Sequence, residues 1–415
     1  MKILWVKAGK LLPVDAGGKI RSYNILRHLQ QNHELVLLTH YGGPRDLWYE
    51  AKIKKHFPAA VPIWTAAPDS STLARLLHYL YCLPSRAPFA VRKFTDRNAG
   101  RQIEKLFQEK HFDAAVCDFL SASLTFPPHR WAETVLFQHN VETVLWERMV
   151  ENESNWLKRF IYRLEAAKMR NYERSSIGKF QRVIAVSEQD RTYMAQFMPS
   201  DKINVVPTGV DLEQYRSNSV GQAARPLVMF TGTMDFEPNV DGVGYFCREI
   251  WPRILQAVPD AQFRIVGKNP VAAVRRLASD TVEFTGTVSS VAEHLQQAWV
   301  LVVPLRMGGG TRLKIYEGMA VGRAVVSTSI GAEGLDVHNG KDILLADEIE
   351  SFAQAVIALL REPELRKRYE RAAAELVARF DWSSVAERFA EVLAGTVPPP
   401  SVHSRDSVHV DAVSG

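Results

Sequence analysis

The stretch with the clearest capacity for chemistry is 302–328, which reads VVPLRMGGGTRLKIYEGMAVGRAVVST. A strand is expected to end at Pro304, glycines follow at 308–310, and a helix is expected at 311–321. The glycines let backbone N–H groups approach a ligand without interference from a Cβ atom. The helix N-terminus favours a phosphate because its N–H groups lack partners and its dipole is positive there. The stretch therefore predicts a phosphate site.

Charged side chains in the same stretch strengthen that prediction. Arg312 can bind phosphate oxygens in a bidentate manner, and Lys314 adds a second positive charge. Glu317, one to two turns into the helix, can accept hydrogen bonds from sugar or ribose hydroxyls. The alternative is an ordinary strand–helix–strand unit with a glycine-rich corner. We prefer the phosphate interpretation because glycines, basic residues and a helix start coincide.

Two polar side chains in the first half of the chain follow expected buried strands. Asp118 ends the strand at 114–118, and His139 follows the strand at 134–138. Ligands of open α/β sheets bind at the carboxyl ends of the strands, so both side chains are expected to face a cleft. An imidazole can donate or accept a hydrogen bond near neutral pH. A purely structural histidine is the alternative.

Alternating strands and helices must position these residues. The first unit is a strand at 1–6, a loop with Gly17 and Gly18, and a helix at 19–31. Further strands are expected at 34–39, 61–65, 114–118, 134–138, 182–186, 203–206, 227–231, 262–266, 282–284, 299–304, 324–328 and 343–345. Further helices are expected at 46–55, 97–110, 146–175, 239–255, 291–298, 349–360, 363–379 and 381–393. The alternation predicts an α/β protein with two parallel-sheet domains.

Length and composition agree with two domains of ordinary size. The chain has 415 residues, of which 46% are hydrophobic, so both domains can bury a core. Its three cysteines form no C-x-x-C pair, which indicates neither a disulfide framework nor a zinc site and fits a reducing cytoplasm. The apolar start is too short for a signal peptide, and no apolar run approaches the ~20 residues of a membrane-spanning helix.

The charge of the chain favours anionic partners. The formal net charge is +5 and the pI is near 9.0. Nucleotide phosphates, lipid-linked phosphates and an anionic membrane face all fit this charge. The sequence contains no zinc-finger, RNP-like or helix-turn-helix pattern, so we expect no nucleic-acid partner.

Two segments combine apolar and basic residues. The segment 72–94 is rich in Leu, Tyr, Arg and Lys and is broken by Pro84 and Pro88. The expected helix at 146–175 places arginines at helical spacing beside an apolar face. Each segment is either an ordinary packed or solvated element, or a surface that touches an anionic membrane.

The stretch at 302–328 resembles the donor-site signature of retaining glycosyltransferases with the GT-B fold, family four of the sugar transferases. That family usually carries an E-x7-E motif here; Glu317 matches the second Glu, and Gly309 stands at the first position. The form GGGTRLKIYEGMA resembles a branch common in transferases that build bacterial surface polysaccharides. The segment FQHNVET at 137–143 resembles the family's acceptor-side histidine motif, and PTGVD at 207–211 resembles its PNGVD hinge.

The resemblance implies two facing Rossmann-like domains with a deep interdomain cleft and a C-terminal crossover helix. The expected acceptor domain comprises 1–210 together with a crossover helix at 381–395. A linker at 211–226 leads to the donor nucleotide-sugar domain at 227–380. The polar, proline-containing tail at 396–415 is expected to be disordered.

The resemblance also implies roles for particular residues. His139 and Asp118 are the expected catalytic residues, and Gly17 and Gly18 form the expected cleft loop. Asn239 stands near a position where the family has a lysine, so Arg312 and Lys314 are expected to supply that charge. Glu333 is a secondary candidate. The expected donor-binding residues are Gly232, Thr233, Thr285, Gly286, Val288, Gly309, Gly310, Thr311, Arg312, Lys314 and Glu317.

The function implied by the resemblance is transfer of a sugar from a nucleotide-diphosphate sugar to a hydroxyl of a glycan or lipid-linked acceptor, with retention at the anomeric carbon. No D-x-D pair occurs, so neither a metal nor another cofactor is expected. The expected location is the cytoplasm, and peripheral attachment to the inner face of the plasma membrane is a further option that the sequence leaves open. Two alternatives stay open: a non-catalytic nucleotide-sugar-binding protein and a nucleotide-sugar epimerase. The base, sugar, acceptor, linkage and oligomeric state are not defined by the sequence.

Overall fold

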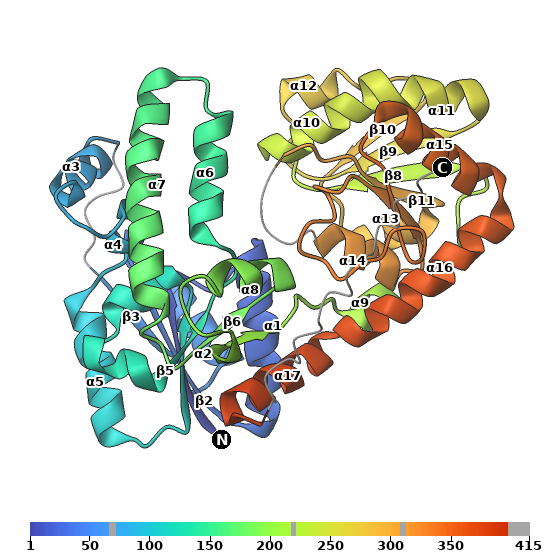
Figure 1. The fold of residues 1–415 in the computed structure, drawn as a ribbon. Coiled ribbons are helices and arrows are strands. Elements are labelled where there is room, and N and C mark those ends of the chain that lie inside the picture. The colour runs from blue at the N-terminus through green and yellow to red at the C-terminus, as the bar shows by residue number, and fades with distance from the viewer. Residues whose placement is uncertain (66–71, 217–220, 308–312, 397–415) are drawn as a thin grey trace, which may run out of the picture.

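The computed structural model describes residues 1–65, 72–216, 221–307 and 313–396, which form two α/β units around parallel sheets (Figure 1). The first sheet contains β1 (Lys2–Ala8), β2 (Glu34–Tyr41), β3 (Val61–Trp64), β4 (Ala114–Asp118), β5 (Thr134–Phe137), β6 (Arg182–Ala185) and β7 (Ile203–Val205). Its strand order is β3-β2-β1-β4-β5-β6-β7. The second sheet contains β8 (Leu227–Thr231), β9 (Gln262–Val266), β10 (Val282–Gly286), β11 (Val300–Val303), β12 (Ala324–Ser327) and β13 (Leu344–Leu345). Its order is β10-β9-β8-β11-β12-β13, so the predicted α/β fold with two Rossmann-like sheets is confirmed.

Helices cover both faces of the first sheet, which is why its central strands are continuously apolar. Trp5 of β1 is fully buried and contacts Phe137 of β5 edge-on, with ring centroids 5.9 Å apart. The helices of this unit are α1 (Gly17–Asn32), α2 (Leu47–His56), α3 (Thr72–Cys82), α4 (Phe89–Arg92), α5 (Arg97–Glu109), α6 (Glu142–Asn152), α7 (Trp156–Ile177) and α8 (Glu188–Met194). Short 3-10 turns are η1 (Leu120–Thr125), η2 (Pro128–Glu133) and η3 (Ser200–Lys202).

The second unit has its own core, in which Phe230, Phe246 and Phe263 are fully buried. Its helices are α9 (Leu212–Arg216), α10 (Glu237–Tyr245), α11 (Trp251–Ala257), α12 (Ala272–Arg275), α13 (Val291–Gln297), α14 (Leu313–Ala320), α15 (Ile349–Arg361) and α16 (Pro363–Val377). A π-helical turn, η4 (Phe246–Ile250), joins α10 to α11, so the helix expected at 239–255 is one continuous helical stretch with a local widening.

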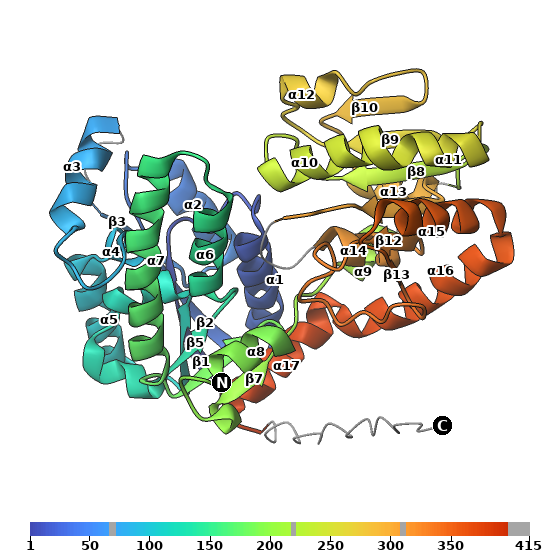
Figure 2. The ribbon, with the colours of Figure 1, turned by 45° about the horizontal axis from the view of Figure 1, so that its top comes forward.

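The last helix returns to the first unit. After α16 and the turn η5 (Ala378–Phe380), α17 (Trp382–Ala394) runs beneath the first sheet beside α1 (Figure 2). Asp381 caps it by accepting a hydrogen bond from the Ser383 N–H at 3.0 Å. Phe389 of α17 lies against Trp5, with ring centroids 5.2 Å apart. The predicted crossover helix is therefore confirmed.

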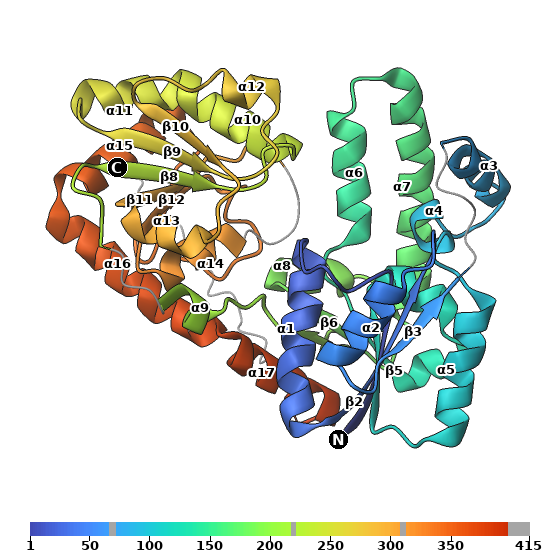
Figure 3. The same ribbon diagram turned by 180° about the vertical axis from the view of Figure 1, so that it is seen from behind.

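The prediction of one helix at 146–175 is wrong, because this region is a hairpin of two helices. Figure 3 shows α6 and α7 side by side, projecting from the sheet. Asn155 ends the connection by accepting hydrogen bonds from the N–H groups of Leu157 and Lys158, at 3.0 and 3.1 Å. This N-cap starts a new helix in the opposite direction.

The segment expected as a polar linker contains a short helix. Asp211 accepts a hydrogen bond from the Gln214 N–H at 2.8 Å and so begins α9. Tyr215 of α9 is buried in the core of the second unit. Among the described residues, no helix combines the length and apolar character needed to cross a bilayer.

Candidate functional site

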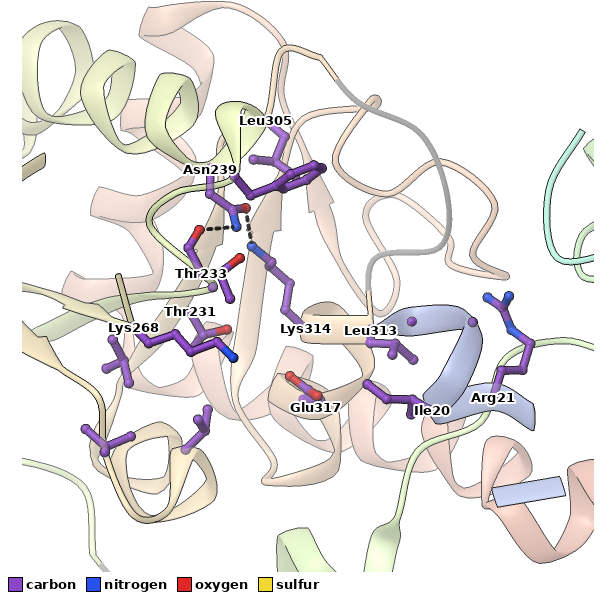
Figure 4. A pocket seen from close by; sticks show the side chains of 18 of the residues that line it. Ile20, Arg21, Thr231, Thr233, Asn239, Lys268, Leu305, Leu313, Lys314 and Glu317 are labelled. Atoms are coloured by element: carbon purple, nitrogen blue, oxygen red, sulfur yellow. Dashed lines mark hydrogen bonds between the residues drawn. The ribbon is translucent and has the colours of Figure 1, made fainter. Parts of the chain in front are cut away.

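A cavity of about 630 Å³ lies between the two units. One wall is the start of α1, and the other is formed by the ends of β8 and β9 and the start of α14 (Figure 4). Ligands bind at such strand ends in open α/β sheets. The lining residues are Gly17, Gly18, Ile20, Arg21, Asn140, Leu145, Thr231, Gly232, Thr233, Phe236, Asn239, Val266, Gly267, Lys268, Thr287, Val288, Val291, Leu305, Leu313, Lys314 and Glu317.

Two glycines bring the ends of β8 and β9 close together at the cavity wall. A Cβ atom on Gly267 would lie 1.7 Å from the carbonyl oxygen of Gly232, a distance that no side chain tolerates. A Cβ on Gly232 would in turn lie 3.0 Å from Nζ of Lys314. Because Gly232 has no Cβ atom, its backbone can lie close to the Lys314 side chain. A ligand bound at this backbone would also lie close to Lys314.

Lys314 supplies positive charge at this wall. Its Nζ donates a hydrogen bond to Oδ1 of Asn239 at 2.9 Å and lies 3.9 Å from the centroid of the Phe230 ring. The Asn239 side-chain amide donates to the carbonyl of Thr233 at 2.9 Å, so three cavity residues form one chain (Figure 4). The lysine of α14 thus reaches Asn239, near the position where the sequence predicts that Lys314 supplies charge.

Glu317, one turn further along α14, is tied to α9. Burial raises the pKa of Glu317, while a hydrogen bond from Tyr215 and the charge of Lys314 act in the opposite direction. The hydroxyl of Tyr215 itself has a raised pKa, because it is buried beside this carboxylate. A carboxylate held in this way can accept hydrogen bonds from hydroxyls of a ligand in the cavity.

The sequence reasoning missed two basic residues of the cavity, Arg21 and Lys268. Nε and Nη2 of Arg21 donate to Oγ1 of Thr208 at 2.8 and 2.6 Å, and burial lowers the arginine pKa to about 10, so it stays charged. Lys268 directly follows Gly267 at the end of β9. Two features of the sequence could have indicated these residues: Arg21 is a charged residue on the apolar face of α1, and Lys268 forms a Gly-Lys pair at the end of a strand.

The structure brings together seven of the predicted binding residues. Gly17 and Gly18 line the cavity from the first unit, and Gly232, Thr233, Val288, Lys314 and Glu317 line it from the second. Thr285 and Gly286, at the end of β10, are not part of the lining. The predicted residues Gly309, Gly310, Thr311 and Arg312 lie outside the described residues, as does 397–415 of the predicted tail.

Asp118 and His139 do not line the cavity, because both side chains are fully buried. Nε2 of His139 lies 2.8 Å from Oδ1 of Asp118, whose other oxygen accepts from Trp5, Lys7 and Ser22 at 3.0, 3.0 and 2.7 Å. The expected exposure of both groups to the cleft is therefore corrected: they form a closed network beneath it. Their catalytic role stays a prediction.

Burial sets the protonation of this pair. It lowers the pKa of His139 to about 3, so the imidazole is neutral at physiological pH. Burial alone would raise the pKa of Asp118, but the charge of Lys7 and the His139 hydrogen bond hold it below its ordinary range. Nδ1 of His139 has no hydrogen-bond partner among the described residues, and a Cβ on Gly18 would lie 3.6 Å from it.

Two family models match the chain. The model described as "Glycosyltransferase Family 4" matches residues 16–214, and the model described as "Glycosyl transferases group 1" matches residues 225–362. The boundary between the two matches falls close to α9, where the chain passes from the first sheet to the second.

Curated relatives match over about half of the chain. A phosphatidyl-myo-inositol mannosyltransferase of Mycobacterium leprae is 30% identical over 235 residues, which cover 54% of this chain and 60% of the relative. An uncharacterised 44.6 kDa protein of a Klebsiella pneumoniae cps region is 23% identical over 231 residues, covering 53% and 57%. The chain thus matches about 60% of the length of these relatives.

Solved structures match over nearly the whole chain. Sucrose-phosphate synthase from Thermosynechococcus elongatus has a TM-score of 0.66 at 16% identity, covering 94% of this chain and 98% of the other. The Anabaena protein HepE in complex with UDP has a TM-score of 0.64 at 14% identity, covering 95% and 100%. At this level of identity the likeness establishes the arrangement of two facing sheets.

Proposed function

We propose that the chain is a glycosyltransferase, because residues 16–214 match a Family 4 model and residues 225–362 match a group 1 model, on two facing Rossmann-like sheets. It transfers a sugar from a nucleotide-diphosphate sugar to a hydroxyl of a glycan or lipid-linked acceptor. The observation that carries the proposal is the basic wall of the interdomain cavity, where Lys314 and Lys268 lie beside the close-approaching backbone of Gly232. Positive charge there stabilises the diphosphate that leaves as the glycosidic bond breaks.

The remaining features of the cavity fit the rest of a donor. Glu317 offers a carboxylate for sugar or ribose hydroxyls, and Val288 and Thr287 form an edge on which a base can rest. Arg312 is proposed to complete the phosphate site, as the sequence pattern indicates. A cleft between two units also excludes water, which competes with the acceptor for the activated sugar.

We further propose retention at the anomeric carbon and a role in surface-polysaccharide synthesis. The GGGTRLKIYEGMA stretch supports both by its resemblance to the family four signature, and the similarity to a protein of a cps region supports the second. The reaction is proposed to need no divalent metal, because the sequence offers no D-x-D pair to hold one beside the diphosphate. Its place is proposed to be the cytoplasm, at the inner face of the plasma membrane.

A thermal-shift screen tests the donor site. UDP, GDP, ADP and TDP are added separately to the full chain, with and without magnesium. Bound at 100 times its dissociation constant, the right nucleotide should stabilise the fold by ~2.7 kcal/mol. A shift with one nucleotide, unchanged by magnesium, supports the proposal and names the donor class; no shift with any of the four contradicts it.

Product analysis then distinguishes the reaction from its rivals. The sugar nucleotide of the identified base is incubated with the protein and a cell-envelope lipid extract, and the products are separated. A new glycoside with release of nucleotide diphosphate supports transfer. Interconversion of the sugar nucleotide without a glycoside indicates an epimerase, and binding without turnover indicates a non-catalytic protein.

An apolar face of the first unit is proposed to contact the membrane. Trp156 and Phe160, at the start of α7, are 77% and 55% exposed, and α3 lies next to α7 in every view. α7 contains six basic and two acidic residues, which favours an anionic surface. The exposed large apolar residues of α3, α6 and α7 are Leu77, Leu80, Tyr81, Met149, Trp156, Leu157, Phe160 and Leu164.

Vesicle sedimentation tests this face. Wild-type protein should bind vesicles of phosphatidylcholine with phosphatidylglycerol more than phosphatidylcholine alone, and less at high salt. Trp156→Ser should reduce binding, whereas Trp48→Ser, which changes a tryptophan 65% exposed on α2, should not. Equal binding by the two variants and wild type would assign the hairpin to another role.

A further inference from the structure

A second cavity, of about 480 Å³, lies inside the first unit next to the donor cavity. The two cavities meet at Gly18, which lines both. The walls come from the end of β1, the start of α1, α4, η1 and the beginning of α6. The lining residues are Lys7, Ala8, Gly9, Lys10, Ala16, Gly18, Lys19, Ala90, Val91, Lys93, Phe94, Phe119, Leu120, Ser121, Glu142 and Met169. This mixture of apolar walls and a few polar groups is typical of a small-molecule site.

Three of the four lysines in this cavity already have a carboxylate partner. Nζ of Lys7 lies 3.0 Å from Asp118, Nζ of Lys10 lies 2.6 Å from Asp46, and Nζ of Lys19 lies 2.9 Å from Asp15. Their charges are therefore largely neutralised. The cavity is less basic than its lysine content suggests.

Lys93 and Glu142 differ from these pairs. Within the described parts of the chain, neither side chain forms an ion pair within 4.0 Å or a hydrogen bond of its head group. The Lys93 ammonium lies 4.9 Å from the centroid of the Phe94 ring, and the main-chain N–H of Glu142 donates to Glu173. Burial lowers the pKa of Lys93, and the charge of Glu142 opposes this shift. Burial and Glu173 raise the pKa of Glu142, and the charge of Lys93 opposes that shift, so the two groups act on each other. The cavity thus presents one ammonium donor and one carboxyl acceptor, both available to a ligand.

Phe119 adds an aromatic wall in an unusual backbone conformation. Its φ of 72° lies in a region that bulky side chains avoid, and such strain clusters at functional sites. The ring stacks on the His139 ring, with centroids 3.8 Å apart, and lies against Gly18, where a Cβ would be 2.7 Å from Cζ. The strained loop therefore holds the ring at the point where the two cavities meet.

We propose that this second cavity binds the acceptor and that the bound group is an uncharged sugar unit, with Glu142 and Lys93 binding its hydroxyls beside Phe119. The inference rests on the proposed function and adds the class of acceptor. A sugar ring has apolar faces for the Val91, Phe94 and Phe119 walls and hydroxyls for one donor and one acceptor. A phosphate would be repelled by the carboxylate of Glu142, and among the described residues Lys93 is the one cavity lysine without a carboxylate partner to offset that repulsion, so an anionic acceptor fits less well.

The position of the cavity agrees with an acceptor. Gly18 separates it from the donor cavity, whose basic residues Lys314 and Lys268 lie on the opposite wall. A hydroxyl placed near Gly18 would face a sugar held in the donor cavity. A donor and an acceptor in these two places would meet at the loop that begins α1.

Saturation-transfer NMR on the full chain tests the inference. The probes are methyl α-D-mannopyranoside, methyl α-D-glucopyranoside and mannose 6-phosphate, each with the nucleotide found by the thermal-shift screen. Glu142→Gln and Lys93→Met should weaken methyl-glycoside binding by ~10-fold or more, because the first replaces a carboxylate acceptor by a weaker neutral amide and the second removes the ammonium donor. The matched controls are Glu151→Gln, exposed on the same helix, and Lys110→Met, exposed after α5.

The outcomes separate this inference from the function on which it rests. Weaker glycoside binding by both cavity variants, with unchanged nucleotide shifts, supports it. Wild-type protein that binds nucleotide but neither methyl glycoside overturns the inference and leaves the donor site standing. If the wild-type protein binds mannose 6-phosphate more tightly than the methyl glycosides and Lys93→Met loses this preference, the acceptor is anionic and the inference of an uncharged sugar is overturned. Failure to bind any nucleotide overturns the proposed function itself.

Discussion

Arg148 and Glu333 join the two units by a bidentate ion pair. Nη1 and Nη2 of the arginine, on α6, donate to the two carboxylate oxygens of Glu333, in the loop after β12, at 2.8 and 2.6 Å. Gln189 of α8 donates to the same carboxylate at 3.3 Å. Planar, two-point contacts of this kind fix orientation as well as distance. The pair therefore connects the first unit to the second through two directed contacts.

Breaking the Arg148–Glu333 pair should loosen the two units. Each of Arg148→Ala and Glu333→Gln should cost on the order of 1 kcal/mol in free energy of unfolding, because the pair is partly exposed to solvent. The double variant should cost no more than about the larger single change, since both remove one interaction. Urea unfolding of the wild type, the two single variants and the double variant measures these costs. Small-angle scattering should show a larger radius of gyration for the variants than for the wild type. Strictly additive costs would show that the two residues act separately.

Removing the charge of Lys314 should weaken donor binding. Lys314→Met should raise the dissociation constant of the donor nucleotide by ~10-fold or more, the usual scale for losing a charge-assisted contact. Isothermal titration with the identified nucleotide measures this effect. Lys341→Met, which changes an exposed lysine away from the cavity, is the control. Equal affinities of the two variants would remove Lys314 from the phosphate site. Arg312→Ala is expected to behave like Lys314→Met.

The two glycines at the start of α1 should respond differently to a methyl group. A Cβ on Gly18 would lie 2.7 Å from Cζ of Phe119, whereas a Cβ on Gly17 has no neighbour within 4 Å. Gly18→Ala should therefore displace Phe119 and reduce turnover by ~10-fold or more, while Gly17→Ala should keep turnover near wild type. Steady-state kinetics with the identified donor compare the two. Similar turnover in both variants would show that Phe119 moves without consequence.

Glu142 should lower stability at alkaline pH. Burial and the nearby Glu173 raise its pKa to about 7, from an ordinary 4.5, while Lys93 opposes them. Below pH 4.5 the group is protonated in both folded and unfolded chains; between 4.5 and 7 only the unfolded chain ionises readily, so the folded state loses stability. Glu142→Gln should recover on the order of 1–3 kcal/mol at pH 8 and nothing at pH 4.

Thermal unfolding at both pH values checks the Glu142 prediction. Glu151→Gln is the control, because it makes the same chemical change at an exposed position of the same helix. A gain at pH 8 that is confined to Glu142→Gln would show that the folded chain keeps this carboxyl at a cost to its stability. The same gain at both pH values would assign the effect to helix propensity instead.

Asp118 should be essential to the fold, because it neutralises a buried ammonium. Only 5% of the Lys7 side chain is exposed, and Asp118 is its ion-pair partner at 3.0 Å. Asp118→Asn should cost about 3–5 kcal/mol in free energy of unfolding, the usual result of leaving a buried charge unpaired. Asp260→Asn, at an exposed loop position, should cost little. A small effect of Asp118→Asn in urea unfolding would show that the fold does not depend on the Asp118 charge to accommodate the Lys7 ammonium.

A substitution of His139 tests the predicted catalytic role more directly than a substitution of Asp118 does. His139→Ala is expected to reduce turnover more than donor affinity, because His139 does not line the donor cavity and its Nδ1, which has no hydrogen-bond partner among the described residues, would lie 3.6 Å from a Cβ on Gly18. Turnover and nucleotide affinity, measured on the same preparation, separate the two effects. If both keep their wild-type values, His139 has a structural role alone.

The sheets could be predicted closely, because each strand is a short apolar run between polar turns. The strand expected at 114–118 coincides with β4, and that at 227–231 coincides with β8. The hairpin of α6 and α7 could not be predicted in the same way. The apolar and basic spacing continues past the turn, and the Asn155 cap is a local signal that a long periodic pattern conceals.

The basic wall of the donor cavity could be predicted from the sequence in part, because some of its residues are close together in the chain. Lys314 and Glu317 lie on one helix turn, so a motif reports them together. Arg21, Lys93 and Glu142 come from three separate segments, and only tertiary packing brings such residues to neighbouring cavities. The burial of Asp118 likewise depends on Lys7, which belongs to a different strand.

The return of α17 to the first sheet has a consequence for how the protein is made. Phe389 and Val392 of this helix belong to the same core as Trp5 of β1. A ribosome exposes the first sheet long before it releases α17, although N-terminal units usually fold first. Throughout synthesis of the second unit, the nascent chain therefore carries an uncovered apolar face. A chain interrupted before Trp382 would keep that face open and become a substrate for chaperones and proteases.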